Sequence, residues 1–323
     1  MAEEAAEGIM NNPDTNIFVY TGEQEVPADV THVLIDRSVK IIPERAFKNR
    51  RKLVSVEMHD GVEKIEEYAF IVCISLKGIK LPGVVVVEQS AFFNCTALAD
   101  VEFSDKLETI GGLAFSHCHS LRNIKIPTVK DIGAYAFGAC QQLTDVELPA
   151  VERIGIYAFF SCPLLRRIAI PLKDNVFTPD DIRGCTQFDD CENLTTVDLV
   201  GGLHNTIASL LLESWRNEMN QEINRINQVL PNTRARGKTD AIQGWIRSVI
   251  NRMEHCKAEH YALLKEDMTQ LELALWKAKL DEKNDDSIEE RARIDTAVAR
   301  NERRITSGAS IVIKNVLPFL QLG

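Results

Sequence analysis

Apolar residues recur along the first half of the chain with a period of 22 or 23 residues. The most regular part of this pattern is an Ala-Phe pair, and the residues five and eight positions before each phenylalanine are always Ile, Val or Leu. A fixed period of this length predicts a solenoid, in which each repeat forms one turn of a coil. The six phenylalanines are Phe47, Phe70, Phe92, Phe115, Phe137 and Phe159.

A second apolar pattern follows each phenylalanine and predicts a short strand. Leucine stands six residues after the phenylalanine, Val or Ile three residues further on, and another apolar residue two positions after that. The last two apolar residues flank one outward position, as in a strand with one buried face. A single turn cannot bury its own apolar face, but stacked turns place equivalent residues in shared columns. We therefore expect the phenylalanine column to form the core.

The combined pattern V-x-x-I-x-x-x-A-F-x-x-C-x-x-L-x-x-V/I-x-I/L-P occurs at Val129–Pro149 and again at Val151–Pro171. It resembles the BspA-like class of leucine-rich repeats. The resemblance implies an α/β solenoid, a right-handed coil with a short parallel sheet, and a role in adhesion or protein recognition rather than catalysis. Many members of that class are cell-surface proteins, whereas residues 1–9 are acidic and lack the features of a secretory signal. We therefore expect an intracellular protein, cytoplasmic or nuclear.

Cysteine also has a fixed place in the repeat, three residues after the phenylalanine. Thiols on the same side of successive turns are poorly arranged for pairwise disulfides, whereas a small apolar side chain fills such a position well. We therefore predict buried free thiols, which favour a reducing compartment. The cysteine column consists of Cys73, Cys95, Cys118, Cys140, Cys162 and, after Phe188, Cys191.

Two groups of potential zinc ligands occur in the chain, His117-Cys118-His119 and the pair Cys256 and His260. Structural zinc needs four ligands, and neither group has a second ligand pair nearby, so we expect no metal ion and no other cofactor. The sequence contains no phosphate-binding glycine loop and neither G-x-S-x-G nor H-E-x-x-H. We therefore expect no catalytic residue and no enzymatic activity.

One outward residue lies between the two buried positions of each predicted strand, and its charge alternates over the first five repeats before the sixth places Ala169 there. Adjacent strands place such side chains about 5 Å apart, so opposite charges can form cross-strand ion pairs. The same strip is also the candidate surface for a protein partner, because solenoids commonly bind through an open sheet. Both interpretations stay open. The candidate face consists of Glu57, Lys80, Asp100, Glu102, Asn123, Lys125, Asp145, Glu147 and Arg167, with Ser55 at its start.

The repeat is interrupted at residues 172–190, where Phe188 lies 29 rather than 22 residues after Phe159. This insertion is acidic, and insertions in repeat proteins map to loops that often contact partners. It lacks the ligand spacing and glycine turn of an EF-hand loop, so calcium is not expected. We expect a solvated loop first and a partner contact second, with Asp174, Asp180, Asp181, Asp189 and Asp190 as its acidic residues.

Helical spacing replaces the repeat after about residue 203. Apolar residues three and four apart predict helices at about 203–230, 239–280 and 288–305, followed by an apolar carboxyl-terminal tail. We expect the first two helices to pair as an antiparallel hairpin or bundle, with Pro231 ending the first. The structural alternative is a homo-oligomer formed through residues 203–305. The tail is too short and too interrupted to span a membrane.

The expected domains are a disordered tail at residues 1–16, a solenoid at 17–202 and a helical domain at 203–323. Charge follows this division, because residues 1–200 contain 19 Lys and Arg against 30 Asp and Glu, whereas residues 201–323 contain 18 against 17. A negative solenoid repels phosphates, so nucleic acid is not an expected partner. The basic stretch Arg234-Ala-Arg236-Gly-Lys238 is expected to be a solvated turn.

The run His255–Leu280, which ends Leu-Glu-Leu-Ala-Leu-Trp-Lys-Ala-Lys-Leu, makes the fused layout similar to predicted leucine-rich-repeat proteins of diatoms. This resemblance covers nearly the whole chain and implies the architecture but no activity. The sequence therefore predicts a non-catalytic interaction or scaffold protein, which presents its solenoid surface to a protein partner of unknown identity.

Overall fold

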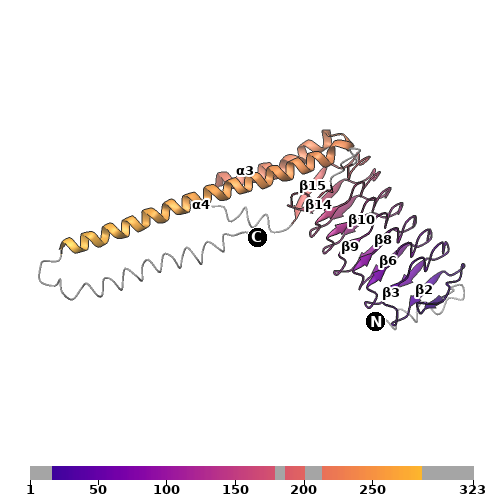
Figure 1. Ribbon diagram of the computed structural model, residues 1–323. Coiled ribbons are helices and arrows are strands. Elements are labelled where there is room, and N and C mark those ends of the chain that lie inside the picture. Colours follow the sequence, from indigo (N-terminus) through magenta and orange to yellow (C-terminus); the bar gives the residue numbers. More distant parts are fainter. Residues whose placement is uncertain (1–16, 179–185, 201–212, 286–323) are drawn as a thin grey trace, which may run out of the picture. The chain divides into compact units, whose positions relative to one another are not determined.

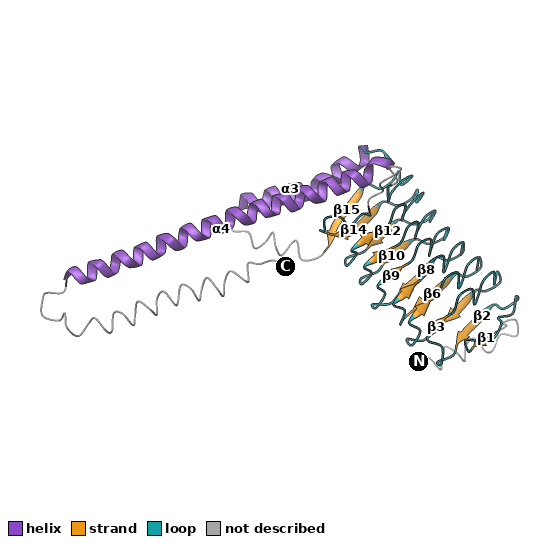
Figure 2. Ribbon diagram, viewed as in Figure 1, coloured by secondary structure: helices purple, strands orange, loops and turns teal. Residues whose placement is uncertain are grey.

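The computed structural model describes residues 17–178, 186–200 and 213–285, with backbone only for residues 278–285. Within these residues the chain forms a parallel solenoid followed by two helices (Figure 1). One turn of the solenoid is called a rung below and is named by its phenylalanine. Loops and turns make up most of each rung, and strands occupy two short stretches of it (Figure 2).

Strands of successive rungs pair in parallel and form three sheets among the described residues. One sheet contains β1 (Ile17–Tyr20), β2 (His32–Ile35), β4 (Ser55–Glu57), β6 (Gly78–Leu81) and β8 (Asp100–Phe103). A second contains β10 (Asn123–Lys125), β12 (Asp145–Glu147), β14 (Arg167–Pro171) and β15 (Thr196–Val200). The third contains the two-residue strands β3 (Ile41–Ile42), β5 (Lys64–Ile65), β7 (Val86–Val87), β9 (Thr109–Ile110), β11 (Asp131–Ile132) and β13 (Arg153–Ile154).

The phenylalanine column forms the core, as the repeat predicts. All six rings of the repeat and that of Phe188 are fully buried, and neighbouring rings stack nearly parallel with centroids between 4.8 Å (Phe47 to Phe70) and 5.7 Å (Phe159 to Phe188). Tyr20 covers the first ring, with centroids 4.9 Å apart. Its strand β1 pairs in parallel with β2, so the stack begins before the first Ala-Phe rung.

Each phenylalanine of the repeat is flanked by two residues with left-handed backbone, two positions before and two positions after it. In the first rung these residues are Arg45 and Asn49, with φ of 60° and 58°. Their N–H groups donate to carbonyl oxygens of the next rung, from Arg45 to Glu67 (3.1 Å) and from Asn49 to Ile71 (2.9 Å). These turns therefore satisfy backbone groups that would otherwise lack partners between rungs.

The helices are α3 (Glu213–Val229) and α4 (Lys238–Asp285), joined by the 3-10 turns η1 (Leu230–Asn232) and η2 (Ala235–Gly237). They form the expected hairpin, and α3 ends just before Pro231. The indole N–H of Trp245 donates to the carbonyl oxygen of Glu222 (2.8 Å), and Arg252 pairs with Glu218 (3.3 Å). The expected helix at 288–305 and the apolar tail lie outside the described residues.

The described residues divide into two compact units. The first contains the solenoid together with residues 216–252, and the second contains residues 213–215 and 253–285. The division expected near residue 203 stays a prediction about domains.

In the second unit, His260 is buried with its ring centroid 6.1 Å from that of Trp215. Beyond it the predicted apolar stripe of α4 is not buried by described residues. Leu271 is 62% exposed and Leu275 is 46% exposed.

Candidate functional site: the open strand face

The candidate face is built by the register of the longer strands. Val56 of β4 lies opposite Ile79 of β6, and both are buried, so the residues that follow them project outward. The same register aligns Lys80 with Glu102, and Lys125 with Glu147. The period-two alternation of each strand therefore creates a column of outward charges from residues that are 22 or 23 positions apart in sequence.

Two ion pairs predicted from the alternating charges are present. Lys80 pairs with Glu102 at 2.9 Å, and Lys125 pairs with Glu147 at 3.0 Å. The Lys80 and Glu102 side chains are 73% and 67% exposed, so solvent screens their attraction and the pair contributes little to stability. Within the described residues Glu57, at the start of the column, makes no ion pair with Lys80.

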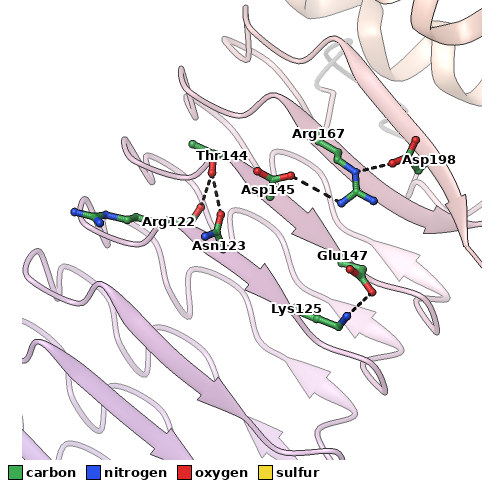
Figure 3. A network of polar contacts seen from close by, with 8 residues as sticks. All are labelled: Arg122, Asn123, Lys125, Thr144, Asp145, Glu147, Arg167 and Asp198. Atoms are coloured by element: carbon green, nitrogen blue, oxygen red, sulfur yellow. Dashed lines mark hydrogen bonds and ion pairs between the residues drawn. The ribbon is translucent and has the colours of Figure 1, made fainter.

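A network of polar contacts crosses the sheet of β10, β12, β14 and β15 (Figure 3). Arg167 lies between two carboxylates, 3.8 Å from Asp145 and 2.5 Å from Asp198. The hydroxyl of Thr144 donates to the Asn123 side-chain oxygen (2.9 Å) and to the carbonyl oxygen of Arg122 (3.2 Å). The charged side chains Lys125, Asp145, Glu147 and Arg167 therefore already form ion pairs within the protein. Asp100 on β8 is exposed and lies opposite Gly78 of β6.

The predicted ladder is not continuous. Strands β8 and β10 belong to different sheets, and among the described residues no ion pair joins Glu102 to Lys125. The charges therefore form separate pairs on each side of this break. The column ends at Ala169, which is fully buried.

The acidic insertion is not the uniformly solvated loop that the sequence predicts. Asp174 is exposed and pairs with Arg247 of α4 at 3.2 Å, and Asp190 is exposed with φ of 60°. Asp189, however, is buried, and its carboxylate accepts a short hydrogen bond from the Thr186 hydroxyl. Its backbone oxygen also accepts a hydrogen bond from the Ser161 N–H at 2.8 Å. Asp189 is thus structural, while Asp180 and Asp181 lie outside the described residues.

The cysteine column is buried and free of disulfides, as predicted. Each thiol donates to the carbonyl oxygen of the phenylalanine on the preceding rung, for example from Cys73 to Phe47 at 3.1 Å and from Cys191 to Phe159 at 2.9 Å. Burial raises the pKa of Cys118 to about 12, so this thiol stays protonated and unreactive at neutral pH. In the described part of the chain no cluster of three potential ligands could hold a metal ion.

Lys238 has a structural role that differs from the one predicted from the sequence. It is fully buried rather than part of a solvated turn, and its ammonium group donates to the carbonyl oxygens of Cys191 (3.1 Å), Glu192 (2.6 Å) and Leu194 (2.7 Å). Burial lowers the pKa of the amine, and the Glu192 carboxylate opposes that shift. A lysine in the first turn of a helix is unfavourable for the helix dipole, which was the one signal of its special role.

The turns beside the phenylalanines carry aromatic side chains that the sequence analysis did not single out. Ring centroids lie 4.8 Å apart for Tyr135 and Tyr157, and 5.4 Å apart for Tyr157 and Phe160. Phe93, one position after Phe92, and His117, two positions after Phe115, make a different contact between adjacent rungs, with ring centroids 5.2 Å apart. Burial lowers the pKa of His117, and the neighbouring His119 adds to that shift. The signal was available in the repeat, because these residues occupy fixed positions relative to each phenylalanine.

Cys256 and His260 are both buried on α4 and have no further ligand cluster around them in the described residues. None of the described helices is long and apolar enough to cross a membrane.

The parallel strands, the stacked phenylalanine column and the regular turns together define a leucine-rich-repeat solenoid. The model of the BspA type leucine rich repeat region, in six copies, matches residues 27–130 and 114–225, which is more than half of the chain. The chain belongs to this family. No curated protein matches it.

Solved structures include similar solenoids. A leucine-rich repeat protein from Bacteroides ovatus is 25% identical, with a TM-score of 0.44, 55% of this chain covered and 49% of that chain covered. The leucine-rich repeat protein of T. pallidum is 23% identical, with a TM-score of 0.40 over 62% of this chain and 92% of that chain. The chain thus spans about half the length of the Bacteroides protein.

Proposed function

We propose that this protein is a non-catalytic interaction or scaffold protein that presents its solenoid to a protein partner. The observation that supports this most is the repeat itself, which keeps one buried side and one open side over successive rungs. Such an extended surface suits recognition of another macromolecule, and membership of the BspA-type family agrees with an interaction role. Neither a cofactor nor a catalytic group enters the proposal.

The open strand face is the first candidate for the contact. Its exposed ion pairs favour a polar protein partner with complementary charges. Breaking an exposed ion pair to form a new one with that protein costs little free energy. We propose that the protein acts inside the cell, because the six buried thiols of the cysteine column form no disulfide and a reducing compartment preserves that state.

The test is quantitative affinity capture with the intact chain and with a variant that reverses the charges of Glu57, Lys80, Glu102, Lys125 and Glu147. Reversing all five preserves the alternation, so the variant is expected to melt like the parent. Partners lost from the variant support recognition by this face. Partners retained by it exclude the charged column as the contact, and absence of any specific partner for either protein opposes the interaction role.

A second candidate function is homo-oligomerisation through the helices. It is favoured by the exposed apolar residues of α4, including Leu271, Leu275 and Trp276, whose side chains another helix could bury. Light scattering over a hundredfold range of protein concentration tests this alternative. A mass that stays at 36.2 kDa excludes it.

A further inference from the structure

The edge of the solenoid formed by the turns differs from the strand face in its chemistry. We define the turn edge by the positions two before and one, two and four after each phenylalanine. On the five rungs from Phe70 to Phe159, none of these positions carries Asp, Glu, Lys or Arg. Since 26% of the chain is charged, this edge is set apart from the rest of the surface.

The turn edge is continuous from rung to rung. Backbone hydrogen bonds between equivalent turns, such as the N–H of Val72 to the carbonyl oxygen of Phe93 (2.8 Å) and that of His117 to Gly138 (2.8 Å), hold the positions in register. Its aromatic residues are half-buried or, in the case of His117, exposed. They are Tyr68, Phe93, His117, Tyr135, Tyr157 and Phe160.

The fold does not require these positions to be uncharged. On the first rung the same positions hold Arg45, Lys48 and Arg51, and Arg45 has the same φ of 60° as its equivalent Tyr68. The Arg45 guanidinium lies 5.2 Å from the centroid of the Tyr68 ring, so the basic rung directly adjoins the aromatic ones. Charged side chains therefore fit the turn, and their absence from five rungs calls for a reason other than folding.

We infer that the turn edge is the docking surface for an apolar segment of a protein partner that carries acidic residues at one end. Tyrosine and arginine are the residues that most often dominate binding energy at protein interfaces. The uncharged rungs would bury the apolar length of the segment, and Lys48 and Arg51 would attract its acidic end, together with Arg45, which already pairs with the adjacent Glu44. This inference rests on the proposed interaction function and moves the contact away from the strand face.

The dimensions of the turn edge indicate the size of that segment. Five rung-to-rung steps span about 24 Å at the spacing of adjacent strands. An α-helix of roughly 16 residues has this length. A protein segment is favoured over an anionic membrane, because the solenoid half of the chain has 30 acidic against 19 basic residues and would be repelled by anionic headgroups.

The test is selection of random 16-residue peptides, displayed on yeast, against the full chain. The key variant, Tyr157→Arg with Phe160→Lys, gives the last uncharged rung the residues that Arg45 and Lys48 already place on the first. A second variant, Phe160→Ser, introduces the residue found at the equivalent Ser116 without adding charge. The matched control exchanges the strand-face pair, as Lys80→Glu with Glu102→Lys.

We expect enriched peptides to be apolar with acidic residues at one end, and to bind both turn-edge variants at least about tenfold more weakly while binding the control unchanged. Peptides lost only from the strand-face control overturn this inference and leave the proposed function standing. A further variant combines Tyr157→Arg, Phe160→Lys, Lys80→Glu and Glu102→Lys. If peptides are enriched on the parent no more than on this variant, the inference and the proposed function are both overturned. Binding of the parent to anionic vesicles that is weakened by Phe160→Ser, the variant without added charge, replaces the protein partner with a membrane.

Discussion

The solenoid and the hairpin that follows it bury their cores in different ways. In the solenoid the same stacking contact recurs on each rung, so the Phe92, Phe115 and Phe137 rings each lie between the rings of the two adjacent rungs. The start of the hairpin relies instead on single contacts, of which the buried Lys238 is the clearest. A contact that recurs on every rung produces a periodic sequence pattern, and that pattern predicts the fold. A contact that occurs once produces no such pattern.

The largest effect is expected for a cavity in the repeated core. Phe115→Ala removes a fully buried ring between Phe92 (5.0 Å) and Phe137 (5.4 Å), and should lower the free energy of unfolding by roughly 3–5 kcal/mol. Urea denaturation followed by circular dichroism measures this loss. Phe93→Ala, at the half-buried turn edge, is the control and should cost clearly less. Equal losses in the two variants would contradict a core confined to the phenylalanine column.

The substitution Lys238→Met tests the contact between the buried ammonium group and the last rung of the solenoid. This change keeps most of the side-chain volume but leaves three carbonyl oxygens of the last rung without their donor, and should destabilise the protein by roughly 2–3 kcal/mol. Arg236→Met is the control, because Arg236 is exposed in the same turn. A melting temperature that Lys238→Met leaves unchanged would contradict this prediction, and would mean that water can donate hydrogen bonds to the three carbonyl oxygens in place of the ammonium group.

The difference between the two regions explains what the sequence could predict. The phenylalanine and cysteine columns were predictable because their period is fixed, and so were the Lys80–Glu102 and Lys125–Glu147 pairs. The break between β8 and β10 was not, since both rungs keep the repeat pattern. Burial of Asp189 and Lys238 depends on residues distant in sequence, which a local pattern of polar residues cannot show.

A stabilising change should come from Val72, the one valine among the described residues that occupies a left-handed turn position. Val72 has φ of 62°, which is unfavourable for a β-branched residue, while the equivalent positions in the adjacent rungs hold Asn49 and Asn94. Val72→Asn should therefore stabilise the protein by about 1 kcal/mol. The same substitution at Val85, outside these turn positions, is the control and should not stabilise. A lower melting temperature for Val72→Asn would mean that side-chain contacts of Val72 outweigh its backbone strain.

The smallest effect is expected on the strand face. A double-mutant cycle with Lys80→Met and Glu102→Gln should give a coupling energy of about 0.2–1 kcal/mol at low salt, because both side chains are largely exposed. The coupling should fall further at 1 M salt, because the Debye length shortens to about 3 Å and dissolved ions compete with each exposed charge for its partner. A coupling well above this range makes the ladder a structural element of the sheet. A coupling near zero means that folding does not explain the alternating charges, and recognition of a partner then remains the reason to keep them.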